Sequence, residues 1–74
     1  MQDLTITLTL KEIDHPDQRI RTREIDGSNF IMENGQMATT QAEREAELLY
    51  WIEERGEQQH NSRLELISFT VQEH

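Results

Sequence analysis

The side chains that could act as nucleophiles are few and scattered along this sequence. Its carboxylates are plentiful, but acid–base catalysis needs one whose pKa is shifted by burial or crowding, and most lie on predicted solvent faces. There is no cysteine, and the serines stand in no catalytic motif: Ser28, Ser62 and Ser68. The histidines fall in a predicted turn, in a predicted linker and at the last position: His15, His60 and His74. A catalytic triad needs a base and an orienting group that are held rigidly, which loop positions do not provide. We therefore expect no enzymatic activity and assign no catalytic residue.

The sequence signals for a metal site and for a nucleotide site are equally weak. Asp14, His15 and Asp17 are close in sequence and could contribute to a metal site with His60 or His74. Their spacing matches no zinc or calcium pattern, and the same residue types are typical of a turn, which we prefer. The three glycines are too far apart to form a phosphate-binding loop. We expect neither a metal nor a cofactor.

Three arginines form the one basic feature of the sequence. On a predicted strand, Arg19, Arg21 and Arg23 would lie on one side, about 7 Å apart. Such a stripe could contact a phosphate backbone or an acidic partner. The formal net charge of −8 disfavours direct binding of nucleic acid. We prefer the interpretation that these arginines pair with neighbouring acids or protect a sheet edge.

The stretch from Thr40 to Gly56 predicts a single helix and contains the strongest functional signal. It holds five consecutive large apolar residues, Leu48 to Ile52, and six acids occur up to Glu57. Because successive helix positions differ by about 100°, five consecutive side chains cannot all face one core. Part of this apolar run must therefore lie on an acidic, outward surface.

We expect one side of this helix to pack and another to bind a partner. The packed side would comprise Ala42, Ala46 and Leu49, with Leu48 and Ile52 beside them. The partner-binding side would then comprise Glu43, Glu47, Tyr50, Trp51 and Glu54. Aromatic side chains commonly anchor protein interfaces, and acids steer a basic partner toward them.

Two other arrangements of Trp51 remain open. The guanidinium of Arg55, four residues further along, could lie over the indole ring. Alternatively, the helix could be rotated so that Trp51 enters the edge of the core and Tyr50 alone stays outside.

The elements that must position this helix are mainly strands. The alternation from Leu4 to Leu10 predicts a strand with one buried face, and Arg19 to Ile25 predicts a second strand. The apolar run Asn29–Glu33 predicts a third, short strand. It is followed by Asn34-Gly35, a favoured two-residue hairpin turn, with Gln36–Ala38 as the return arm.

The ends of the helix and the last strand are also predicted from local signals. Thr40 and Glu43 fit a capping box, whereas Arg55 followed by Gly56 is typical of a helix end. A polar linker, 57–62, would follow. In the strand 63–72 the apolar residues change sides after Leu66, which indicates either a bulge or a central strand covered on both faces. We prefer the central strand.

Together these elements predict one α+β domain spanning residues 1–74. It would have a small mixed or antiparallel sheet of about four strands with one helix, residues about 40–55, on one face, in the order ββ(β)αβ. If the last strand lies beside the first, the two would run parallel at the centre of the sheet, with the helix as the crossover.

Size and composition limit the function classes. With 74 residues, 34% of them hydrophobic and no cysteine, the chain has a small core without disulfides, which favours self-association as a homodimer. The start Met1-Gln2-Asp3 lacks the positive charge of a signal peptide, and no apolar run is long enough to span a membrane. We expect a soluble cytoplasmic protein with no membrane partner.

The leading hypothesis is a small acidic, non-enzymatic protein-binding module. Its acidic helix face would cover a basic, nucleic-acid-binding surface of a partner protein, as a phage-type accessory inhibitor or counter-defence factor would. One alternative is a self-associating structural or assembly component, whose acids only keep it soluble. Another is a protein that sequesters a small ligand. No stretch matches a family motif residue by residue.

Overall fold

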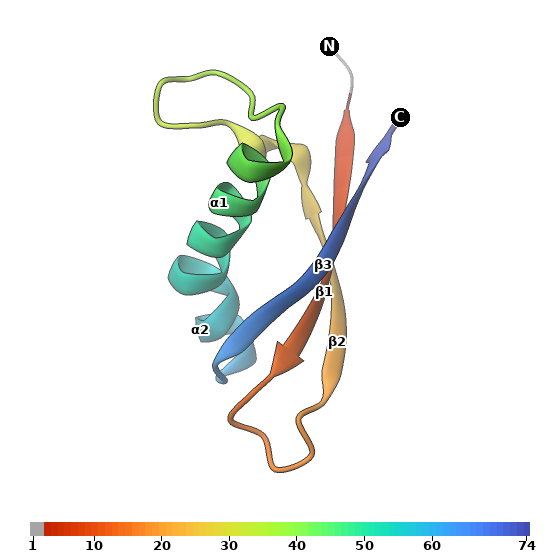
Figure 1. Ribbon diagram of the computed structural model, residues 1–74, viewed down its shortest axis with the longest axis vertical. Helices are drawn as coiled ribbons and strands as arrows, with labels where there is room; N and C mark the ends of the chain where they lie inside the picture. Colours follow the sequence, from red (N-terminus) through yellow and green to blue (C-terminus); the bar gives the residue numbers. More distant parts are fainter. Residues whose placement is uncertain (1–2) are drawn as a thin grey trace.

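The computed structural model describes residues 3–74, and Figure 1 shows one helical layer against one sheet. Met1 and Gln2, on which the expectation about a signal peptide rests, lie outside the described residues. The strands are β1 (Leu4–Glu12), β2 (Ile20–Asp26) and β3 (Leu64–Glu73). The helical elements are the 3₁₀ helix η1 (Gly27–Phe30), α1 (Gln41–Trp51), the π-helical η2 (Ile52–Gly56) and α2 (Glu57–His60). The α+β class is confirmed.

The sheet has the strand order β2-β1-β3, and both strand pairs are antiparallel. The predicted alternation of β1 is confirmed, since Ile6, Leu8 and Leu10 are fully buried beneath the helix. The expectation of four strands is wrong, because three are present in residues 3–74. The last strand, β3, does lie beside β1, but it is antiparallel and at the edge of the sheet, so the parallel direction and the central position are wrong.

The missing strand explains the changed direction of β3. A strand at residues 29–33 without a return arm would take the chain across the sheet once more before the helix, but these residues begin in η1 and continue in a loop. The helix therefore starts at the end of the sheet where β2 finishes. The chain reaches the opposite end one pass earlier, so β3 runs antiparallel to β1 and begins beside Glu12.

The segment 27–38 curls over one end of the sheet. Gly27 lies so close to β1 that an added Cβ would be 2.6 Å from the Cβ of Leu4. The hairpin turn at Asn34-Gly35 is present, but as a three-residue loop in which the Met32 carbonyl accepts from the Gly35 N–H at 2.8 Å. Within this loop Gly35 has a positive φ, +85°, as expected for such a turn. The predicted return arm is reduced to one bridge between Ile31 and Met37.

The helix begins where expected and ends later. Thr40 and Glu43 form the predicted capping box. The predicted end at Gly56 is wrong, because η2 and α2 continue the helix to His60, and Asn61 ends it with a left-handed φ of +51°. The expected polar linker 57–62 is thus mostly helical. Gly56 is instead a packing residue, since an added Cβ would lie 2.8 Å from Cζ3 of Trp51.

The irregular pattern of β3 is caused by a bulge. Leu10 pairs with Leu66 but Thr9 pairs with Ser68, so Ile67 has no partner on β1 and stands half exposed. The bulge returns Phe69 to the face of Leu66, against the core. The bulge interpretation is therefore right, and the preferred central strand is wrong.

Candidate functional site

The candidate site is a groove between α1 and the segment 28–33. One hollow of about 290 Å³ is lined by Ser28, Asn29, Ile31, Glu47, Tyr50, Trp51, Glu54 and Arg55. A second hollow, of about 520 Å³, is lined by Ile31, Met32, Glu33, Ala46, Glu47 and Tyr50. The two share Ile31, Glu47 and Tyr50, and together they are named the Tyr50 groove below.

Two large apolar side chains dominate the surface of the Tyr50 groove. Tyr50 is 62% exposed and Ile31 is 50% exposed, although both are large enough to be favoured in a core. They come from different elements, α1 and the hairpin after η1. Neighbouring exposed apolar groups on separate elements are the kind of surface that a partner protein covers.

The rotation of the helix decides which aromatic faces outward. Leu48, Trp51 and Ile52 are buried, and Trp51 is only 6% exposed. Trp51 therefore belongs to the core and contributes only to the wall of the first hollow. The expected anchor role of an exposed Trp51 is wrong because of this burial. Of the two aromatic residues, Tyr50 alone is left outside, as the alternative described.

The expected packed side of the helix is right at Leu48 and Ile52 but wrong at its other three residues. Ala42 and Ala46 are exposed, and Leu49 is 50% exposed. The physical reason is the size of the side chains. Burying Trp51 with its neighbours removes far more apolar area from water than burying two alanines would.

Glu43 lies apart from the groove and has a structural role. Its Oε1 accepts backbone N–H bonds from Thr39 at 3.2 Å and from Thr40 at 3.1 Å. These bonds lower the pKa of the Glu43 carboxyl below its ordinary value of 4.5, and the bond from Thr40 has the largest effect. Of the predicted partner-binding residues, the structure thus brings Glu47, Tyr50, Trp51 and Glu54 together and separates Glu43 from them.

Acids outnumber bases around the Tyr50 groove. Glu33, Glu47 and Glu54 line it, against one cation, Arg55. In the part of the chain that the structure describes, the ion pairs all involve Glu12, so these three acids are in none of them. The lining of the groove therefore combines exposed apolar side chains with an excess of acids.

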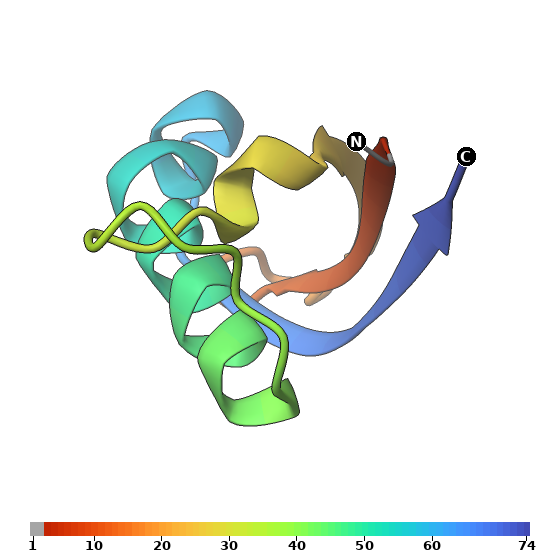
Figure 2. The ribbon, with the colours of Figure 1, turned by 90° about the horizontal axis from the view of Figure 1, so that it is seen from above.

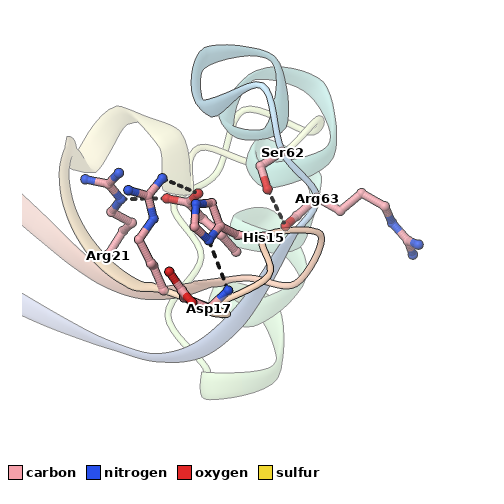
Figure 3. A network of polar contacts seen from close by, with 7 residues as sticks. His15, Asp17, Arg21, Ser62 and Arg63 are labelled. Carbon is pink, nitrogen blue, oxygen red and sulfur yellow. Dashed lines mark hydrogen bonds and ion pairs between the residues drawn. The ribbon is translucent and has the colours of Figure 1, made fainter.

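The arginine stripe is largely engaged with one buried acid. Glu12 is 4% exposed, and its carboxylate accepts from Nε of Arg21 at 2.6 Å and from Arg19 at 3.4 Å, within the polar network of Figure 3. The bond from Arg21, followed by the charge of Arg19, holds the pKa of Glu12 below its ordinary 4.5. The interpretation that the arginines pair with neighbouring acids is right for Arg19 and Arg21.

The turn at residues 13–17 matches its prediction. Nδ1 of His15 accepts the N–H of Asp17 at 3.2 Å, which is a local turn bond and is drawn in Figure 3. Across residues 3–74, no group of three or more His, Cys, Asp and Glu side chains is placed to hold a metal ion. Nor is any helix in that range long and apolar enough to cross a membrane.

Sequence reasoning missed Ile31 as a groove residue. Its signal was the apolar run Phe30-Ile31-Met32, which was interpreted as a strand. In the structure Phe30 is fully buried while Ile31 turns outward beside Tyr50. Comparisons with protein-family models, with curated proteins and with solved structures find no match for this chain.

Proposed function

We propose that this protein is a non-enzymatic binding module whose Tyr50 groove takes a basic segment of a partner protein. The observation that carries the proposal is that two exposed apolar side chains, Tyr50 and Ile31, line the same groove as an excess of acids. The complementary segment would present an apolar side chain to Tyr50 and Ile31, flanked by Lys or Arg.

Burial and charge would contribute differently to such a complex. Tyr50 carries a large apolar surface with few rotatable bonds, so covering it costs little conformational entropy. Glu33, Glu47 and Glu54 would attract a basic segment over several ångströms, and the net charge of −8 would add to this attraction. The association rate should therefore fall as salt concentration rises.

A basic surface on the partner also suggests what binding would achieve. Surfaces rich in Lys and Arg commonly bind the phosphates of nucleic acids. A protein that covers such a surface with carboxylates would compete with the nucleic acid. In this proposal the chain inhibits a nucleic-acid-handling protein. A phage-type counter-defence factor would act in this way.

The test compares neighbouring residues of α1. Tagged wild type, Tyr50→Ala and Leu49→Ala are used to capture proteins from a host lysate, and the affinity of each variant for the identified protein is then measured at low and high salt. Leu49 is the matched control, because it is 50% exposed but lines neither hollow. We expect Tyr50→Ala to weaken binding at least roughly tenfold and Leu49→Ala to change it little.

The charge component has its own variant. Glu47→Gln with Glu54→Gln should slow association at low salt and have little effect at high salt. Equal loss in Tyr50→Ala and Leu49→Ala would refute the groove. Binding to a protein without a basic surface, or binding that does not depend on salt, would refute the charge-led function.

A further inference from the structure

The open edge of β3 is a second candidate binding surface. Unlike the Tyr50 groove, it presents unpaired backbone groups. The N–H of His74 donates to the Asp3 carbonyl at 2.9 Å, which shows that His74 points its backbone groups toward β1. In an antiparallel ladder this direction alternates along the strand. Phe69, Val71 and Glu73 therefore point their N–H and C=O groups away from β1, along the open edge.

The opposite edge of the sheet differs in charge. The Arg19 carbonyl accepts from the Glu12 N–H at 2.8 Å, so the outward groups of β2 belong to Ile20, Thr22, Glu24 and Asp26. Acids on an edge strand oppose pairing with another copy. The stretch 66–72 of β3 contains no charged residue, so it lacks this protection.

Side chains of β3 are also left partly uncovered. Phe69 and Val71 lie on the helix side of the sheet and are only partly buried. Figures 1 and 2 show the carboxyl-terminal half of β3 running past the helical layer, away from α1. A strand added here would complete the backbone ladder and cover apolar side chains. Near Phe69 it would lie beside the hollow that Gln41 and Glu45 of α1 form with β3.

We propose that two copies of this chain pair through their β3 edges, antiparallel and about a twofold axis at Thr70. Phe69 of each copy then lies opposite Val71 of the other, and these outward-pointing residues exchange backbone hydrogen bonds. Each Glu73 faces the bulged Ile67, so no acid opposes another acid. Moving the axis to Phe69 would set Glu65 against Glu73, and moving it to Val71 would set Glu73 against Phe69.

The two sheets would thereby form one continuous sheet, with β2 at both outer edges. Because each copy carries a net charge of −8, the bodies repel one another, and screening should strengthen the dimer. This salt dependence is opposite to the one expected for the Tyr50 groove, so the two proposals fail or succeed independently.

The test is the mass in solution, measured by sedimentation equilibrium over a concentration series at low and high salt. We expect wild type to reach twice the monomer mass of 8.8 kDa, at lower concentration when salt is high. Val71→Pro removes an N–H that the β1–β3 ladder does not use, and should weaken the dimer by roughly tenfold or more. Thr22→Pro is the matched control, because it removes an outward N–H from the β2 edge and should leave the dimer intact.

Two further measurements keep the proposal testable if a proline variant does not fold. Val71→Lys retains the backbone donor but places a charge opposite Phe69 of the second copy, and should also give monomers. In wild type, amide exchange at Phe69 and Val71 should slow as protein concentration rises. A wild-type monomer at every concentration, a dimer that persists in Val71→Lys, or a dimer lost in folded Thr22→Pro would each overturn the proposal.

Discussion

Replacing Trp51 by alanine tests whether this side chain is part of the core. Trp51 is 6% exposed, and its ring packs closely over Gly56. Truncating a buried tryptophan to alanine costs about 3–5 kcal/mol. A domain of 74 residues is stable by roughly 4–11 kcal/mol, at about 0.05–0.15 kcal/mol for each residue. The variant should therefore lose at least a quarter of its stability, and its Tm should fall by about 12 °C or more.

The neighbouring residue provides the control for this prediction. Tyr50 is 62% exposed, so Tyr50→Ala should change the free energy of unfolding by less than about 1 kcal/mol. Both variants are followed by urea denaturation with far-UV circular dichroism, because Trp51 is the one tryptophan available for fluorescence. In wild type, its emission should be blue-shifted and protected from acrylamide. A loss below about 1 kcal/mol in Trp51→Ala, or equal losses in the two variants, would refute the burial argument.

Three further substitutions test packing, capping and pH dependence. Gly56→Ala should destabilise by about 1 kcal/mol in thermal denaturation, because the contact with Trp51 outweighs the better helix propensity of alanine. Thr40→Ala should cost about 1 kcal/mol through the lost cap, measured in the same way, whereas an unchanged Tm would contradict the capping box. For Glu12, whose pKa is lowered on folding, the stabilisation is present above pH 4.5 and is lost as pH falls through the lower folded value. Glu12→Gln should thus be less stable than wild type at pH 7, and urea denaturation at pH 3 should show a smaller difference.

The parts of the fold that could be predicted rest on signals that are local in sequence. The alternation of β1 and the capping box at Thr40 both involve groups a few residues apart, and both are correct. The end of the helix was missed because a glycine after a basic residue has two explanations. At Gly56 the close approach of Trp51 requires glycine within a continuing helix, and this contact cannot be seen from propensities.

The sheet order depended on tertiary structure in the same way. A strand and a 3₁₀ helix have similar apolar content over four or five residues, and the choice at Asn29–Phe30 is made by packing of Phe30 into the core. Because the chain does not cross the sheet again as a strand before the helix, β3 runs antiparallel to β1. For the candidate site, the helical period placed Glu47, Tyr50 and Glu54 near one another, but Ile31 is brought to them by the fold of a separate segment.

The position of β1 in the middle of the sheet also governs the order in which the protein can fold during synthesis. The β1–β2 pair and the helix α1 each form from residues that are near one another in sequence. Both can therefore begin to form early in synthesis. The pairing of β1 with β3 joins Leu4 to Glu73. The hydrogen bonds on this side of β1 therefore cannot form until β3 has been synthesised. A ribosome-bound chain that stops before Leu64 should therefore leave Leu10 and its neighbours accessible to protease. Resistance should appear only once β3 has emerged, which makes the fold dependent on this strand.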